Sequence, residues 1–322
     1  MRVKMIRHLY LAVMALAAGL GWPAAGHADK SSNTLVVAFN NEVYTLDPAT
    51  GFAGSDYPVL YSIYDRLVNF DPKTMHPLPG LATKWTFEGA DKRDFVMTIR
   101  HGVTFQDGTK LDAAAVKASL EHFKTMKRLN DLDVVTSIET RGDDQVVLHL
   151  SQEFSVLPAV LSDRAGMIVS PAALAKYGSD FSRHPVGAGP FMLHEWQPGT
   201  SIDLAKYPGY WDAQRIKLSG IRYNLILNPT SVVTAMLAGQ ADHAWGLDPK
   251  NLPILKASPR LRVAKEPSTE FFYIALRHDM SPVDNKLVRE VLNMSIDRGA
   301  QAAAVLGPVR SVGPALMLAP PE

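Results

Sequence analysis

Apolar residues in the first two thirds of the chain gather in short runs or alternate with polar residues, and both patterns predict β-strands. Residues 35–39 form a continuous apolar run of the length of a buried strand, and polar residues follow it directly. Short segments of similar character predict further strands over 85–87 and 221–227. Apolar side chains at every second position predict strands with one buried face over 95–100 and 146–150.

Helical spacing of apolar residues appears between these predicted strands. It runs over residues 57–68 and returns after Asp112, whose side chain suits the N-cap position. The helix that follows Asp112 is predicted to bury an apolar stripe formed by Val116, Leu120 and Phe123. Mixed strands and helices over residues 65–170 therefore predict a compact α+β region inside a larger α/β protein.

The last third of the chain is predicted to begin a new unit. A helix over 231–237 should end at Gly239, and residues 171–265 should complete the sheet that the first strand begins. The apolar and aromatic segment 268–276 reads as a strand that crosses to a second lobe. A long helix is then expected over 284–306. Its predicted buried residues are Leu287, Val288, Val291 and Leu292.

The run from Val186 to Asp212 carries the densest turn signals of the chain. Two strand-like segments, 191–196 and 201–207, flank Gln-Pro-Gly-Thr at 197–200, so a hairpin is predicted. The Gly-Ala-Gly-Pro cluster before it predicts a tight corner. A phosphate-binding loop is the alternative, but that fingerprint needs a third glycine where Met192 stands.

Residues 1–28 have the layout of a signal peptide. A basic start precedes an apolar stretch of 14 residues from Leu9 to Trp22, and small residues then favour cleavage before Asp29. The alternative is a membrane anchor, which requires about 20 apolar residues. Export to the periplasm is therefore expected.

Composition excludes several classes of site. Cysteine is absent, which excludes disulfides, thiolate metal sites and attachment of a lipid to cysteine. Lys and Arg number 33 against 32 Asp and Glu, and the signal segment holds three basic residues, so the remainder carries 30 minus 32, or −2. Near-neutrality gives no indication of a nucleic-acid partner. No His-Glu-x-x-His, Gly-x-Ser-x-Gly or P-loop motif occurs, so no enzyme, metal or cofactor is predicted.

Ordered blocks of sequence resemble family 5 of the extracytoplasmic solute-binding proteins, the oligopeptide, dipeptide, glutathione and nickel receptors of ABC transporters. The blocks are LDP at 46–48, YDRLVNFD at 64–71, PGLATKW at 79–85, TIRHGVTFQDGTKLDAAAVKASL at 98–120, the run 186–212, AGQAD at 238–242 and VREVLNMSIDR at 288–298. Gln106 stands where the family commonly has histidine, and Ala188 replaces a frequent threonine. Both departures are interpreted as structural.

The resemblance implies a two-lobed type II periplasmic binding protein fold with an extra α+β subdomain and an incomplete second lobe. Members of the family continue beyond the block matched by the last residues, so residues 268–322 are expected to be poorly packed if the chain ends there. The implied divisions are 1–28 as signal peptide, 29–64 plus 171–265 as the core sheet of lobe one, 65–170 as the inserted subdomain and 266–322 as the crossover and beginning of lobe two.

The implied function is capture of a small solute for an inner-membrane ABC permease. A short peptide or peptide-like compound is the expected ligand, and the receptor is expected to be a monomer that is free in the periplasm and carries no lipid. A nickel chelate, haem, a sugar or an opine are alternative ligands within the same role. The alternative from another class is an exported α/β hydrolase.

The family places certain loops around the cleft between the lobes, and these supply the candidate ligand-binding residues. The candidates are Asn41, Glu42, Tyr44, Arg164, Trp245, Thr269 and Phe271. A guanidinium such as that of Arg164 suits a bidentate contact with a carboxylate, although it could instead be a surface charge paired with Asp163. Trp245 could stack on a ligand or belong to the core. Residues 41–44 could be a solvated loop.

Overall fold

The structure, a computed structural model, describes residues 32–51, 53–264 and 274–307. The predicted signal peptide, the candidates Thr269 and Phe271 and most of the predicted crossover strand lie outside the described residues. No helix within the described ranges is long and apolar enough to cross a membrane.

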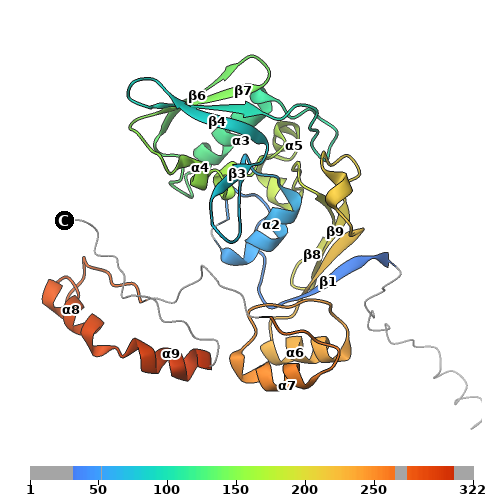
Figure 1. Ribbon diagram of the computed structural model, residues 1–322, viewed down its shortest axis with the longest axis vertical. Helices are drawn as coiled ribbons and strands as arrows, with labels where there is room; N and C mark the ends of the chain where they lie inside the picture. Colours follow the sequence, from blue (N-terminus) through green and yellow to red (C-terminus); the bar gives the residue numbers. More distant parts are fainter. Residues whose placement is uncertain (1–31, 52, 265–273, 308–322) are drawn as a thin grey trace, which may run out of the picture.

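One mixed sheet carries the elements around which the candidate site is built (Figure 1). Its strand order is β1-β10-β9-β8, with β1 Thr34–Phe39, β10 Gly220–Leu225, β9 Ser201–Lys206 and β8 Phe191–Gln197. Strand β1 pairs with β10 in parallel, and the other pairs are antiparallel. The predicted completion of the sheet by residues of the 171–265 region is thus confirmed.

The predicted hairpin is β8 and β9. Gly199 takes a φ of +70°, which glycine adopts without strain, and the amide of Thr200 donates to the carbonyl of Gln197 at 3.0 Å. The turn Gln-Pro-Gly-Thr therefore closes the two strands as its composition indicated.

A second, antiparallel sheet has the order β4-β5-β7-β6. Its strands are β4 Ala82–Glu88, β5 Asp94–Ile99, β7 Gln145–Leu150 and β6 Val135–Arg141. Helix α3, Ala113–Met126, packs against it. Asp112 caps this helix by accepting a hydrogen bond from the amide of Ala115 at 3.0 Å, and the predicted stripe of Val116, Leu120 and Phe123 is buried.

Helix α2, Tyr57–Ile63, is shorter than predicted. Residues 57–68 were expected to be helical, but Tyr64 is extended at φ −115° and ψ 127°, and strand β2, Val68–Phe70, pairs with β3, Pro77–Pro79. The carbonyl of Ile63 accepts hydrogen bonds from the amide of Gly189 and from the side chain of Gln106, both at 2.9 Å. Partners distant in sequence therefore fix the end of this helix.

Helix α6, Pro229–Ala238, confirms the predicted helix that ends at Gly239, which takes a φ of +73°. Val232 of α6 packs with Val36 and Ala38 of β1. In Figure 1, α6 and α7 lie at one end of the molecule and the second sheet at the other. The remaining helices are α4 Leu157–Val160, α5 Pro171–Tyr177, α7 Leu252–Ala257, α8 Lys286–Ser295 and α9 Arg298–Leu306, with short 3₁₀ turns at Gly54–Asp56, Arg164–Gly166, Gly178–Arg183, Ala213–Arg215 and Pro249–Asn251.

Helices α8 and α9 correct the expectation of one helix with a buried stripe over 284–306. Ile296 is extended, and Asp297 caps α9 by accepting from the amide of Ala300 at 2.9 Å. The side chains of Leu287, Val291 and Leu292 are 68%, 64% and 40% exposed, and Val288 is half-buried. Helical spacing predicted the helix, but burial also needs an opposing surface.

Candidate functional site

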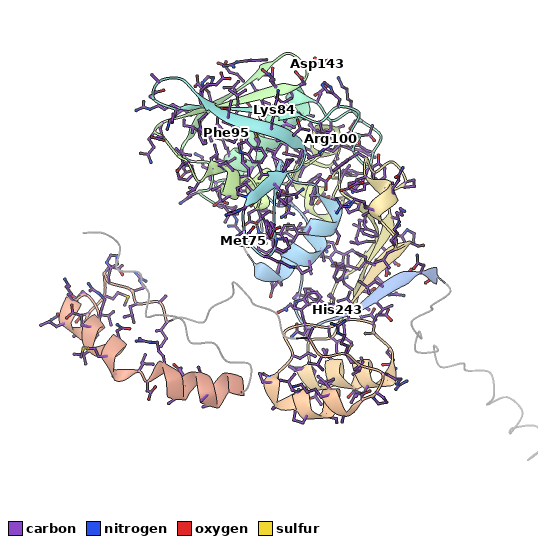
Figure 2. The ribbon with its side chains drawn as sticks, in the orientation of Figure 1. Met75, Lys84, Phe95, Arg100, Asp143 and His243 are labelled. Atoms are coloured by element: carbon purple, nitrogen blue, oxygen red, sulfur yellow. The ribbon has the colours of Figure 1, made fainter. Side chains whose placement is uncertain are left out.

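The candidate site forms where the chain leaves the carboxyl end of β1, the edge at which α/β sheets present ligand-binding loops. Ala38 donates its amide to the carbonyl of His243 at 2.9 Å, so residues 242–243 run beside β1. This pairing places the ring of Trp245 5.2 Å from the ring of Phe39 and 5.5 Å from that of His243. Figure 2 labels His243, which lies beside β1. Trp245 is half-buried there and packs on the core of the first sheet.

Residues Asn41, Glu42 and Tyr44 occupy the loop that follows β1. Asn41 is exposed and its amide donates to the side-chain oxygen of Asn40 at 2.9 Å. The side chain of Tyr44 is 70% exposed, although its backbone amide is tied to the Asp56 carboxylate at 3.1 Å. The backbone of this loop is fixed while its aromatic side chain projects into solvent.

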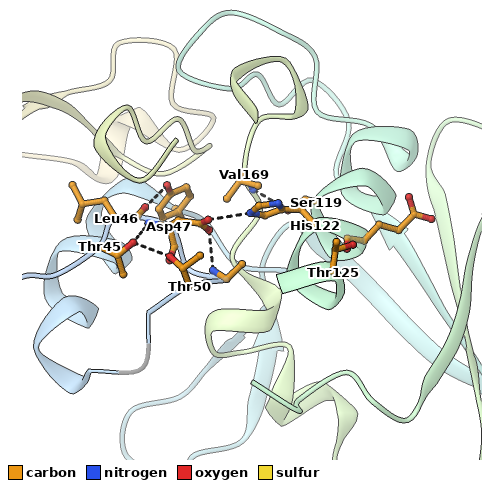
Figure 3. Close-up of polar contacts among 11 residues, drawn as sticks. Thr45, Leu46, Asp47, Thr50, Ser119, His122, Thr125 and Val169 are labelled. Carbon is orange, nitrogen blue, oxygen red and sulfur yellow. Dashed lines mark hydrogen bonds and ion pairs between the residues drawn. The ribbon is translucent and has the colours of Figure 1, made fainter. Parts of the chain in front are cut away.

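The loop that follows Tyr44 is held from behind by helix α3. Figure 3 shows the Asp47 carboxylate between two partners. Its Oδ1 accepts from the amide of Ala49 at 2.9 Å, and its Oδ2 lies 3.1 Å from Nε2 of His122. One turn earlier on α3, the hydroxyl of Ser119 accepts from the amide of Val169 at 3.0 Å. Helix α3 thus fastens both this loop and the segment that follows Arg164.

Arg164 is buried, with 2% of its surface exposed. Its Nη2 donates to the carbonyl of Ala53 at 2.6 Å and lies 3.7 Å from Oδ2 of Asp56, and its guanidinium carbon sits 4.2 Å from the centroid of the Tyr57 ring. The Asp163 carboxylate accepts from the backbone amide of Arg164. The alternative that Arg164 is a surface charge paired with Asp163 is therefore wrong, because its guanidinium is buried toward Asp56.

A cavity of about 240 Å³ lies between the loop that follows β1 and the loop that follows α3. It is lined by Tyr44, Thr45, Thr50, Gly51, Ala53, Asp56 and Arg128. Asp56 is fully buried, and the resulting desolvation raises the pKa of its carboxyl, against the opposing effects of the Tyr44 amide and the Arg164 charge. Neither Oδ2 of Asp56 nor Nη1 of Arg164 has a hydrogen-bond partner among the described residues.

A larger hollow, of about 440 Å³, lies beside α8. It is lined by Ser281, Pro282, Asp284, Asn285 and Val288. Four of these residues are exposed, and no candidate residue lies among them. The lining of the smaller cavity instead includes the candidate residue Tyr44 and the buried carboxylate of Asp56. Within the described part of the chain no group of three or more His, Asp or Glu side chains could hold a metal ion.

The run 186–212 holds the sheet to its surroundings and takes no part in the cavity. The Gln106 side-chain amide donates to the carbonyls of Ile63 at 2.9 Å and Phe191 at 2.8 Å, and its oxygen accepts from the amide of Gly187 at 3.0 Å. A Cβ on Gly187 or Gly189 would stand 2.3 Å or 2.6 Å from the backbone of Ile63. The two glycines allow this close approach, so the corner is structural.

Two of the segments that the sequence predicted as ligand-binding lie close together in the structure, but two residues near them were not predicted. Trp245 and the Asn41–Tyr44 loop both flank the end of β1, and Arg164 reaches the same loop through Asp56. Asp56 and Gly51 were not predicted. Their local sequence reads as an ordinary turn before a helix, and only the distant Arg164 gives them their role.

Comparison with known proteins agrees with the resemblance to the family 5 solute-binding proteins. The profile of "Bacterial extracellular solute-binding proteins, family 5 Middle" matches residues 76–321. The glutathione-binding protein GsiB of Salmonella paratyphi A is 32% identical over 302 residues, which are 92% of this chain and 58% of that protein. The chain thus spans a little over half the length of the curated relatives it matches.

Solved structures share the fold. The dipeptide-binding protein of Pseudoalteromonas sp. SM9913, in complex with Met-Leu, is 21% identical with a TM-score of 0.75, over 84% of this chain and 58% of that one. NikZ of Campylobacter jejuni with Ni(L-His) is 24% identical with a TM-score of 0.74, over 85% and 55%. MoaA of A. tumefaciens R10 with mannopinic acid is 27% identical with a TM-score of 0.71, over 84% and 56%. The predicted α/β periplasmic binding protein fold is confirmed.

Proposed function

Because the chain belongs to family 5 of the bacterial extracellular solute-binding proteins, we propose that it captures a small solute in the periplasm and delivers it to an inner-membrane ABC permease. The proposed ligand is a short peptide or peptide-like compound. The observation that carries this proposal is the arrangement at the end of β1, where Trp245 packs on Phe39 and Asp56 joins the Tyr44 loop to Arg164. The resemblance to the glutathione-binding GsiB supports a peptide-like ligand over a nickel chelate or an opine.

The proposal also assigns roles to other parts of the chain and names the residues that contact the ligand. Residues 1–28 are proposed to direct export and to be removed, and residues 65–170 to form an inserted subdomain. The second sheet and α3 lie wholly within 65–170, which supports the division. Asn41, Glu42, Tyr44, Arg164 and Trp245 are proposed to contact the ligand, and so are Thr269 and Phe271, which lie outside the described residues.

Capture is proposed to follow the population-shift mechanism of two-lobed receptors. A ligand that contacts both lobes binds the closed state better than the open one and so shifts the population toward closure. The aromatic side chain of Tyr44 is exposed and Trp245 is half-buried, so both have surface left for such a ligand. The guanidinium of Arg164 is buried beside Gly51, and the residues that line the cavity do not include it.

Thermal unfolding of the full chain with a panel of solutes tests the proposal. Glutathione, the dipeptide Met-Leu and the Ni(L-His) complex are added separately, and a true ligand at 100 times its Kd adds about 2.7 kcal/mol to the free energy of unfolding. Glutathione or the dipeptide should raise the melting temperature, and Tyr44→Ala and Trp245→Ala should reduce that rise. Ile254→Ala, an exposed apolar change on α7, is the matched control.

The results of this experiment test solute capture and the location of the binding site separately. A panel that leaves the melting temperature unchanged would contradict solute capture by this chain. A shift that survives both aromatic variants would keep the receptor function and move the site away from the end of β1.

A further inference from the structure

Residues 249–264 form a strongly basic surface at one end of the molecule. They include α7 and the chain that follows it, and α6 lies beside them (Figure 1). This segment contains no acidic residue and four basic ones, which are Lys250, Lys256, Arg260 and Arg262. All four are exposed. The surface that they form is the basic end of the molecule.

The basic end differs in charge from the rest of the chain. Residues 29–322 carry 30 basic and 32 acidic side chains, and without the basic end the count is 26 against 32, or −6. The near-neutral total therefore conceals a separation of charge. An anionic surface attracts the basic end and repels the remainder, so it orients the molecule with α7 toward it.

Ion pairs neutralise only one of these cations within the described residues. Nζ of Lys250 lies 2.7 Å from Oδ2 of Asp248. Lys256 and Arg262 form no ion pair with any residue that the structure describes. Their charges therefore remain available to an external anion.

Arg260 fastens the basic end to α6. Its Nη2 donates to the carbonyl of Leu237 at 2.5 Å, and a Cβ on Gly239, the C-cap of α6, would stand 3.8 Å from its Nη1. Carbonyls at a helix C-terminus carry partial negative charge, which suits a guanidinium. The segment that carries Arg262 is thus held against α6, so its cations have a fixed place on the folded molecule.

An apolar side chain stands among the cations. Ile254 on α7 is 53% exposed, whereas the adjacent Leu255 is buried. Lys250 precedes Ile254 by four residues, and Lys256 follows it by two. The interface of an anionic bilayer accepts both kinds of side chain, because lipid phosphates attract the cations and an apolar side chain enters the boundary of the acyl chains. An acidic protein surface suits the cations alone.

We propose that the basic end binds the surface of an anionic membrane reversibly, with its cations on lipid phosphates and Ile254 at the boundary of the acyl chains. Each Lys or Arg near such a surface strengthens binding by about fivefold, so a few cations give a weak contact that can form and break. The proposal goes beyond solute capture and does not rest on it, because no candidate ligand-binding residue lies within residues 249–264.

The experiment places a fluorophore that reports an apolar environment at chosen sites on the full chain. Because the chain has no cysteine, one introduced cysteine gives a single label. Ala257→Cys places it on the exposed end of α7, and Thr86→Cys places it on β4 in the second sheet (Figure 1). The vesicles contain phosphatidylglycerol with phosphatidylcholine, or phosphatidylcholine alone. The emission of the label on α7 should shift to the blue with the anionic vesicles only, and the label on β4 should not respond.

Charge variants test whether the basic end makes the contact. Lys256→Gln and Arg262→Gln should each weaken binding to the anionic vesicles by about fivefold, and the double variant by about 25-fold. Lys84→Gln removes an exposed lysine from β4 and is the matched control, which should leave binding unchanged. Residues 1–28 are present in every sample, so any affinity of theirs for lipid is common to all variants.

Two further measurements separate a membrane from an acidic polypeptide. Ile254→Ser should weaken binding to the anionic vesicles and leave binding of poly-L-glutamate unchanged, because only the bilayer offers an apolar contact. Sodium chloride at about 1 M, which shortens the screening length to about 3 Å, should release the chain from the vesicles.

Each outcome decides for or against the membrane proposal. A response of the label on α7 that requires phosphatidylglycerol and weakens in Lys256→Gln but not in Lys84→Gln supports it. No response on α7, an equal response to phosphatidylcholine alone, or an equal response on β4 overturns it. Complete displacement from the vesicles by poly-L-glutamate at the same charge concentration also overturns it and assigns the surface to an acidic polypeptide. Thermal shifts with glutathione and Met-Leu test solute capture separately, so either proposal can fail alone.

Discussion

Helices α3 and α8 begin from similar sequences and end in different surroundings. Each has an apolar stripe at helical spacing and an N-cap side chain, Asp112 for α3 and Asn285 for α8, that accepts a backbone amide. Leu120 of α3 is fully buried against the second sheet, whereas Leu287 of α8 is 68% exposed. N-caps and apolar spacing specify a helix locally, but burial of its apolar side chains depends on the surface against which it packs.

Helix α3 also makes polar contacts with segments distant in sequence. Ser119 and His122 reach the segment after Arg164 and the Asp47 loop, respectively, so one helix joins the second sheet to the candidate site. Substitutions in and around α3 should therefore disturb both stability and the site. Equivalent substitutions in α8 should disturb neither.

The largest effect is expected from the apolar side of α3. Leu120→Ala removes a fully buried side chain and should lower the free energy of unfolding by about 2–5 kcal/mol, because the cavity it leaves closes only in part. Urea unfolding followed by circular dichroism measures the change. A loss below about 1 kcal/mol would mean that α3 is no better packed than α8.

The buried carboxyl of Asp65 should make the free energy of unfolding depend on pH, by an amount similar to the loss expected for Leu120→Ala. Burial raises the pKa of Asp65 to about 6, while hydrogen bonds from Trp211 at 2.6 Å and Tyr210 at 3.2 Å oppose the rise. The folded state then binds the proton more tightly than the unfolded chain, whose carboxyl titrates near 3.8. Stability from this group is fully present below pH 3.8 and is lost as the pH rises to about 6, by at most about 3 kcal/mol.

Urea unfolding between pH 4 and pH 7 measures this contribution. Asp65→Asn should flatten the dependence, because an amide does not titrate in this range and its oxygen still accepts from Trp211. Asp71→Asn is the control, since hydrogen bonds from Thr74 and Lys73 lower the pKa of that exposed carboxyl. An unchanged slope in Asp65→Asn would contradict the assignment.

A smaller effect is expected from the polar side of α3. His122→Ala removes the partner of Asp47 Oδ2, and a buried acceptor left unpaired costs about 1–3 kcal/mol. Hydrogen exchange should also quicken at the amide of Ala49, which the same carboxylate holds. His122→Gln, which can still donate toward Asp47, should restore part of both losses. Equal loss in the two variants would show that the ring matters only through packing.

The elements that the sequence predicted correctly are those whose structure depends on residues close together in the chain. The β8–β9 hairpin was readable because Pro198 and Gly199 suit the turn, and α3 because Asp112 precedes an apolar stripe. The end of α2 was not readable, since the carbonyl of Ile63 is captured by groups more than 40 residues away. The pairing of Asp56 with Arg164 was hidden for the same reason, and it buries an arginine that the sequence allowed either to contact a ligand or to be a surface charge.

The smallest effect is expected from α8. Leu287→Ala and Val291→Ala shorten side chains that already face solvent, so each should change the free energy of unfolding by less than about 0.5 kcal/mol. Urea unfolding of the same full chain used for Leu120→Ala gives a direct comparison. Two losses of the size expected for Leu120→Ala would show that α8 packs against a surface in solution, and the difference between the helices would then vanish. Small losses would establish that amphipathic sequence alone, without an opposing surface, contributes little to the stability of the protein.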